Sequence, residues 1–358
     1  MLAIGGLPRG HRYHLMILFS MTTVGIIHAL QFFVYYFSAF FSGIKILDAD
    51  ILFNGFSNPR FFGQFQAMLI PVMAALIMRC RRTQLTGTAT LLALALIGQW
   101  CIALTLGGRG LWLGLLASNF TLTLLSRQLR QILFVQTGTA FIGFMLYALL
   151  FWLIPFWFEI DLTLHSNLRT GLSGREIIWR SASEMVLAHP WFGVGPMHFA
   201  ATYNAIAAHP HQAILQWAAE WGIAATLIAL YLGARGLGHG ARTLLQHTAN
   251  ELDAGLWIAI VGTLVLAQVD GVFVMPYTET WLALLSGVAL ARWSTPHPPS
   301  VTQRFACLII TLPIAIVLGK ILISEAPALP QATNEYMTAH QTGWTPRFWL
   351  QGWIPMEN

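Results

Sequence analysis

The arginine at position 109 is the first residue whose setting suggests chemistry. It lies in the string Gly107-Gly108-Arg109-Gly110, in which glycines permit a tight turn and the close approach of another group to the backbone. A guanidinium is a fixed fork of donors that fits phosphate oxygens and keeps its charge. Arg109 is therefore a candidate catalytic residue that binds phosphate. The alternative is an interfacial arginine whose head group only reaches water from the end of a membrane helix.

Two histidines follow one another closely in the string His209-Pro210-His211-Gln212. Free imidazole has a pKa of about 6.5 and is available as a neutral base at neutral pH, which makes His211 a candidate catalytic base. We expect Pro210 in the first turn of a helix, where its missing N–H costs nothing, and His209 beside the substrate. The alternatives are loop histidines that only precede a helix, and a zinc site, which the lack of a third ligand at metal spacing disfavours.

Three polar side chains recur every four residues on the helix expected to follow: Gln212, Gln216 and Glu220. This spacing places them in one stripe about 12 Å long, and such a stripe inside a membrane must face protein or water. We expect Gln212 and Gln216 to contact the substrate. Glu220 and Asp270 are interpreted as hydrogen-bonded residues inside the bundle rather than as a proton relay.

An amphipathic helix is predicted over residues 175–188, whose apolar positions recur at near-helical spacing. Arg175 stands at its amino-terminal end, where the helix dipole disfavours a cation unless an anion is also present. A bound phosphate would supply that anion, so Arg175 is the third candidate catalytic residue. Three other basic residues expected on the same side of the membrane are assigned to substrate binding: Arg60, Arg169 and Arg180.

Asp48 and Asp50 have the spacing of carboxylate pairs that hold a divalent metal in some lipid-linked glycosyltransferases. A solvated pair of loop carboxylates is the more common arrangement, and the arginines can supply the positive charge that a metal would supply. We therefore expect no metal and no cofactor.

Membrane helices must position these residues. Of the 358 residues, 56% are hydrophobic and only 9% are charged, against about 25% charged in an average globular chain. A soluble fold is disfavoured, and so is nucleic-acid binding, because the 19 Lys and Arg are scattered instead of forming one stripe. We predict an all-α, polytopic membrane bundle with nine spans at about 15–40, 61–78, 86–106, 111–126, 131–157, 212–234, 254–274, 279–291 and 305–323.

The distribution of basic residues orients this bundle. Most of the Lys and Arg precede the first span or fall in alternate gaps, and the positive-inside rule makes that side cytoplasmic. The amino terminus is therefore expected in the cytoplasm, and the first apolar stretch, too long for a secretory signal peptide, is expected to span the membrane. Beyond the membrane bundle of 1–323, the outer side would carry a short tail, 324–358. The largest external loop is 158–211, where function is expected.

Two stretches resemble the O-antigen ligase family, whose fold is shared with O-antigen polymerases and protein O-oligosaccharyltransferases. They are SGREIIWRSASEMVLAHPWFGVGPMHF, from position 173, and HPHQAILQWAAEWG, from position 209. The family pattern of His, then Asn, Ser or Gln, then nine residues and Gly is met by His211, Gln212 and Gly222, with Ala225 in place of a second glycine.

Two further segments extend the resemblance to about 58–225. GGRGLWLGL, around Arg109, resembles a basic, glycine-containing turn of the family, and NPRFFGQFQAMLIP, at 58–71, is similar to a segment of its protein-glycosylating members. Ligases of this family commonly have more spans than nine, so we expect amino-terminal helices to be lacking here. The tail is also shorter than the soluble domain of some protein-glycosylating relatives.

The resemblance implies a glycosyltransferase of the bacterial inner membrane with its active site at the periplasmic face. Such enzymes pass a glycan from an undecaprenyl diphosphate donor to an acceptor hydroxyl, on lipid A-core or a pilin-like protein, without a metal and with inversion. By resemblance, Arg109 and Arg175 would bind the diphosphate leaving group and His211 would activate the acceptor. The implied partners are this donor, this acceptor and the lipid bilayer, with no nucleic acid.

Three other functions stay open at this point. An O-antigen polymerase has the same fold, and a non-catalytic assembly protein would have the same composition. A proton-coupled membrane transporter would use Glu220 and Asp270 as carriers, although the inverted repeats common in transporters are not visible in the sequence.

Overall fold

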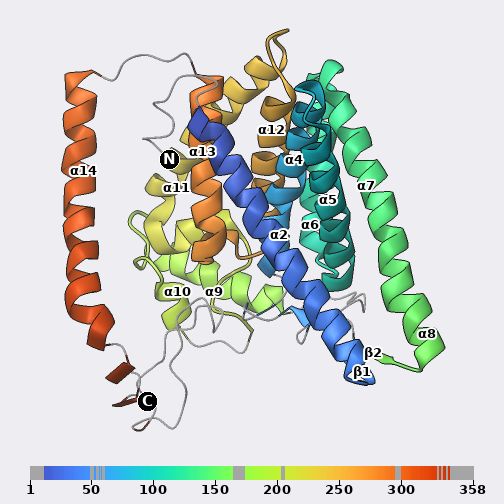
Figure 1. Cartoon of the computed structure of the whole chain (residues 1–358). Helices are drawn as coiled ribbons and strands as arrows, with labels where there is room; N and C mark the ends of the chain where they lie inside the picture. The colour runs from blue at the N-terminus through green and yellow to red at the C-terminus, as the bar shows by residue number, and fades with distance from the viewer. Residues whose placement is uncertain are drawn as a thin grey trace.

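The chain folds into a bundle of helices, and the computed structural model describes residues 12–48, 52, 53, 56, 58, 61–163, 174–202, 206–294, 300–328, 330, 331, 334, 335 and 338. In Figure 1 the long helices stand side by side, α9 and α10 lie across one end of the bundle, and α14 stands apart at one side. The elements are α2 (Arg12–Phe41), β1 (Ile46–Asp48), α4 (Phe61–Arg82), α5 (Thr86–Leu106), α6 (Arg109–Leu125), η1 (Gln128–Arg130), α7 (Gln131–Ala148), η2 (Leu149–Leu153), α8 (Ile154–Phe158), β2 (Asp161–Thr163), α9 (Arg175–Ala188), α10 (His198–Ala201), α11 (Ala213–Leu244), α12 (Glu251–Leu266), η3 (Val272–Val274), α13 (Pro276–Trp293), α14 (Val301–Lys320), η4 (Ile321–Glu325) and η5 (Ala326–Ala328).

Six segments among the described residues are long and apolar enough to cross a membrane: α2, α4, α5, the stretch Gln128–Phe158, α11 and the stretch Thr311–Ala328. The chain is thus a helical membrane protein, as predicted. The other three expected spans coincide with α6, α12 and α13, which are helices of 17, 16 and 18 residues. For these three, membrane crossing stays a prediction.

Helices α4 and α12 form the centre of the bundle, with nearly all of their side chains buried. Small residues let the helices approach one another closely, as is usual between helices in a membrane. A Cβ added to Gly114 of α6 would clash with the carbonyl of Gly262 in α12, and one added to Gly255 would lie 2.9 Å from the carbonyl of Pro71 in α4.

A buried ion pair closes the end of the bundle opposite α9. Nε of Arg292, in α13, lies 2.8 Å from Oδ1 of Asp253, and Nη2 lies 3.0 Å from Oδ2. Nη2 also donates to Oδ1 of Asn250, the N-cap of α12, at 2.9 Å. Asp253 is 0% exposed and Arg292 is 4% exposed. The pair therefore joins the carboxyl end of α13 to the amino end of α12.

Two short strands modify the all-α prediction. β1 and β2 pair in parallel, with Ile46 opposite Asp161, and so join the first interhelical loop to the start of the 158–211 segment. Asp48 is the last residue of β1, whereas Asp50 lies outside the described residues, so the metal-binding alternative for this pair is not tested. The described residues of the tail end at 338, and the predicted tail of 324–358 lies largely outside them.

Helix α11 is broken at Gly222, which has φ 82° and ψ 165°. A helix break leaves backbone groups that need new partners, because no water is available inside a bilayer. The loop after α9 supplies them: the amides of Val194 and Gly195 donate to the carbonyls of Ala219 and Glu220 at 2.9 and 3.0 Å. The amide of Ile223 in turn donates to the carbonyl of Pro190 at 2.8 Å.

Replacing Gly222 by alanine should destabilise the protein by about 2–3 kcal/mol. The left-handed φ strains any residue with a Cβ, and this Cβ would clash with the carbonyl of Trp191. The melting temperature of the purified protein in detergent tests this. Gly233→Ala is the matched control, because Gly233 lies in the same helix with nothing within 4 Å of an added Cβ. Equal melting temperatures for the two variants would contradict the role given to the break.

Candidate functional site

The site is built around one turn of chain, residues 267–271, which follows α12. We expected this stretch to lie inside a span of 254–274, but α12 ends at Leu266, so the predicted helical extent was wrong and Asp270 lies outside the helix. The dipeptide Asp270-Gly271 favours a turn over a continued helix, which accounts for the early end.

Arg175 contacts this turn from the start of α9. Its Nη2 donates to the carbonyl of Val269 at 2.9 Å. Arg175 is the first residue of α9, and the N-cap before it, Gly174, has φ 77° and no capping side chain. The predicted helix of 175–188 is thereby confirmed, with Arg175 at the predicted end. Uncapped amides and a guanidinium together make this end of α9 positive.

The start of α6 meets the same turn. Gly110 lies so close that an added Cβ would be 3.3 Å from Cγ2 of Val269. Gly107 has φ 62° and ends α5, and Gly108 is the N-cap of α6, again without a capping side chain. Arg109 follows as the first residue of α6 and is exposed. Two helices that begin with Gly-Arg therefore start beside Val269.

His211 is held against the turn from a third direction. It precedes Gln212, the N-cap of α11, and has φ 54°, a left-handed conformation that costs a residue with a Cβ about 1 kcal/mol or more and is commonest at functional sites. Nε2 of Gln212 donates to Oε1 of Gln268 at 3.1 Å, and the amide of Ala213 donates to the carbonyl of Ala267 at 2.9 Å. These bonds fix the histidine segment to the turn.

Pro210 does not lie in the first turn of α11, as the sequence had suggested. The helix begins at Ala213, and Gln212 occupies the cap position with its Oε1 accepting from the amide of Leu215. The carbonyl of Pro210 instead accepts a hydrogen bond from Nε1 of Trp179, in α9, at 3.0 Å. Helix α9 therefore supports the histidine segment as well as carrying Arg175.

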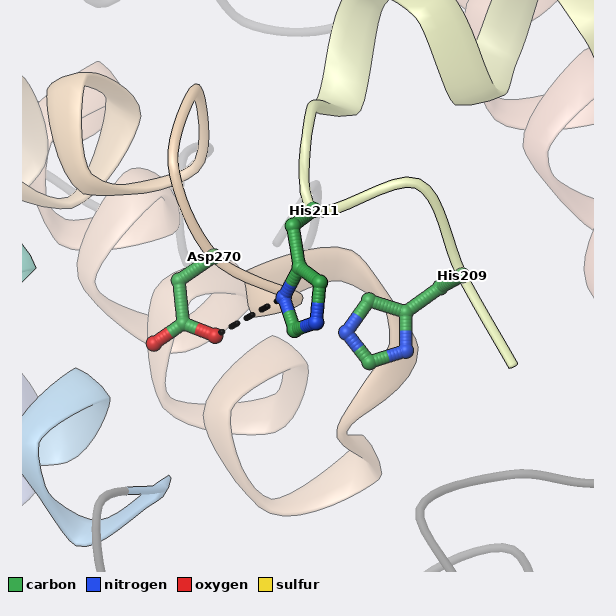
Figure 2. Close-up of side chains that lie close together, drawn as sticks. All are labelled: His209, His211 and Asp270. Carbon is green, nitrogen blue, oxygen red and sulfur yellow. Dashed lines mark ion pairs between the residues drawn. The ribbon is translucent and has the colours of Figure 1, made fainter. Parts of the chain in front are cut away.

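Asp270 and His209 lie on opposite sides of the His211 ring (Figure 2). Nδ1 of His211 is 3.6 Å from Oδ1 of Asp270, and the two imidazole centroids are 4.2 Å apart. Burial raises the pKa of Asp270, but the contact with His211, the amide of Gly271 and the charge of His209 lower it by more, so the pKa lies below its ordinary value. An ionised Asp270 favours the proton on Nδ1 of His211, which leaves Nε2 as the basic nitrogen.

The remaining predicted residues divide into three groups. Gln216 and Glu220 are buried, with Nε2 of Gln216 3.4 Å from Oε2 of Glu220, so the polar stripe faces protein as predicted. His209 is 0% exposed, and Arg180 is exposed on α9. Two residues assigned to substrate binding lie outside the described part of the chain: Arg60 and Arg169.

The turn of 267–271 was not predicted from the sequence as a component of the site. Val269 contributes only its backbone carbonyl, which no residue-type pattern could reveal, and Gln268 acts through the N-cap of α11. Asp270 was recognised as polar but was assigned to the interior of a span. The signal that could have found it is the Asp270-Gly271 dipeptide at the end of an apolar stretch, a common turn sequence.

An apolar cavity of about 240 Å³ lies on α11 a short distance from the histidines. It is lined by Trp217, Trp221, Ala225, Thr226 and Ala229, on both sides of the break at Gly222. The cavity therefore begins about one helical turn after Gln212, the N-cap of α11.

Comparison with known proteins gives one family. Residues 89–230 match the family described as O-antigen ligase, and the matched range contains Arg109, Arg175 and His211. No curated protein and no solved structure matches the chain. The family match confirms the resemblance found in the sequence.

Proposed function

We propose, from the membership of residues 89–230 in the O-antigen ligase family, that this membrane protein transfers a glycan from undecaprenyl diphosphate to an acceptor hydroxyl at the periplasmic face. Ligases and polymerases of this family are glycosyltransferase-like enzymes. The observation that carries the proposal is the meeting of Arg175, the start of α6 and His211 at one turn of chain.

The two helix starts bind the diphosphate. Arg109 and Arg175 each follow a glycine N-cap with no capping side chain, so each offers backbone amides, a helix dipole and a guanidinium to the same anion. Negative charge grows on the diphosphate as the sugar–oxygen bond breaks. Fixed cationic donors stabilise that charge without reorganising, and this lowers the barrier to transfer.

His211 is the base that activates the acceptor. The charge of Asp270, 3.6 Å from Nδ1, favours the proton on that nitrogen, and Nε2 takes the proton of the acceptor hydroxyl as its oxygen attacks the anomeric carbon. Attack from the face opposite the leaving diphosphate inverts the configuration. Asp270 acts through His211 and is therefore a positioning residue.

The donor lipid enters beside α11. The apolar cavity at Trp217 and Trp221 begins about one turn into α11, the helix that follows His211, and would take the hydrocarbon of the lipid diphosphate. The basic end of the bundle, which carries Arg82 and Arg292, would face the cytoplasm by the positive-inside rule, and the turn would face the periplasm.

Arg109→Ala and Arg175→Ala should each lower transfer by roughly 100- to 1,000-fold, the usual loss when one donor to a developing anion is removed. Transfer from purified lipid-linked glycan is followed by the mass increase of the acceptor, with membrane levels checked by immunoblot. Arg127→Ala is the matched control, an exposed arginine outside the site. Unchanged transfer in both site variants would contradict the proposed diphosphate site.

The acceptor class is decided by the same readout. The three possible acceptors are separated by which purified fraction gains mass: lipid A-core, a pilin-like protein or a second glycan repeat. A mass gain in the glycan repeat alone would indicate a polymerase. A proton-coupled transporter would use Glu220 and Asp270 as proton carriers. Asp270 lies beyond the end of α12 and pairs with His211, which disfavours this alternative.

A further inference from the structure

We propose that His209, His211 and Asp270 form a binding site for a divalent transition-metal ion of the Zn²⁺ type, and that its occupation switches off His211 as a base. Each of the three side chains can offer one ligand atom, and the three atoms lie within 4.8 Å of one another. The binding site itself rests only on this geometry. Its effect on transfer rests on the proposed function.

The spacing of the ligand atoms fits a metal better than a direct ion pair. Charge-assisted hydrogen bonds between nitrogen and oxygen measure about 2.7–2.9 Å, whereas Nδ1 of His211 and Oδ1 of Asp270 are 3.6 Å apart. Two ligands at about 2.1 Å from a tetrahedral ion are about 3.4 Å from each other. An ion between these atoms therefore requires only a small adjustment of the two side chains.

Backbone contacts hold the three ligands before any ion binds. The amide of Gly271 donates to Oδ1 of Asp270 at 2.7 Å. Gly271 also lies directly against the ring of His209, because a Cβ added to Gly271 would clash with Nε2 of His209. The bond between the amide of Ala213 and the carbonyl of Ala267 ties the two loops together. Such preorganisation reduces the conformational entropy that the three side chains lose when a metal binds.

Two imidazoles and one carboxylate are typical ligands for borderline metals such as Zn²⁺, whereas Ca²⁺ and Mg²⁺ prefer oxygen ligands. Sequence spacing had disfavoured zinc because His209 and His211 lacked a third ligand. The turn after α12 supplies that ligand as Asp270. Three protein ligands leave the fourth position of a tetrahedral ion open.

A metal at this site removes the base needed for transfer. Coordination uses the lone pair of Nδ1 of His211, so the ring proton moves from Nδ1 to Nε2, and Nε2 can then no longer accept a proton from the acceptor hydroxyl. The ion also neutralises Asp270, which otherwise orients the ring. We therefore expect Zn²⁺ to inhibit transfer reversibly.

Metal binding is tested on the purified full-length chain in detergent micelles by competition for Zn²⁺ with a fluorescent chelator. The wild-type chain should bind one ion at this site, and Asp270→Asn, which keeps the size of the side chain, should weaken binding at least about 100-fold. His209→Ala should do the same, provided that its melting temperature is retained. His189→Ala, an exposed histidine at the end of α9, should bind as wild type. Wild-type affinity in Asp270→Asn and His209→Ala would overturn the site.

Inhibition is tested in the acceptor-mass assay. Zn²⁺ should stop transfer by the wild-type chain and by His189→Ala, and a chelator should restore it. Stimulation by Zn²⁺, or no effect at concentrations that fill the site, would overturn the inhibitory role. If the wild-type chain binds Zn²⁺ at these residues but transfers no glycan without metal, the proposed function fails while the metal site stands.

Discussion

Replacing His211 by alanine is expected to lower glycan transfer by roughly 100- to 10,000-fold, the contribution of a positioned general base. The acceptor hydroxyl would then have to lose its proton without a positioned base. Arg109 and Arg175 would still hold the diphosphate, so donor binding should change little. The measurements are the rate of acceptor mass increase and, separately, retention of radiolabelled donor by the purified protein.

The variant Asp270→Asn tests the positioning residue while leaving the base, His211, unchanged. The amide keeps the shape of the side chain but not its charge, so His211 stays in place and its preference for the proton on Nδ1 weakens. We expect a smaller loss of transfer than in His211→Ala, together with a changed dependence of the rate on pH. His189→Ala serves as the control on an exposed histidine. Full activity in His211→Ala would remove the base from the mechanism.

Part of this site could be predicted from local sequence. Helix α9 begins at Arg175 and ends at Ala188, as the apolar spacing indicated, because that spacing and the flanking glycines act over a few residues. The turn that carries Arg109 was found for the same reason, because Gly107 and Gly108 end one apolar helix and begin the next.

The rest depends on contacts between distant segments. Hydropathy marked 254–274 as one apolar stretch, but α12 ends at Leu266, and the turn after it is held by hydrogen bonds from Arg175 and Gln212, which are distant in sequence. The break of α11 at Gly222 was not predicted either, since a glycine is tolerated in a membrane helix and its partners come from residues 190–195. Membrane crossing by α6, α12 and α13 stays a prediction, because these helices are not among the six described segments that are long and apolar enough to span a membrane.

The second large effect is expected far from the site, at the buried pair of Arg292 and Asp253. Arg292→Met should destabilise the protein by about 3–5 kcal/mol, because it leaves the carboxylate of Asp253 uncompensated at 0% exposure. The change also removes the donor to Asn250, which caps α12. The free energy of unfolding in mixed micelles with SDS measures the effect.

The double variant Arg292→Met/Asp253→Leu tests the cause. If the cost comes from an unpaired buried charge, replacing both partners by apolar side chains should restore much of the stability lost in Arg292→Met. Arg242→Ala, an exposed arginine in the last turn of α11, should change stability by less than about 1 kcal/mol. A double variant that loses the sum of both single effects would show that the two side chains act independently, and that the pair is not what joins α13 to α12.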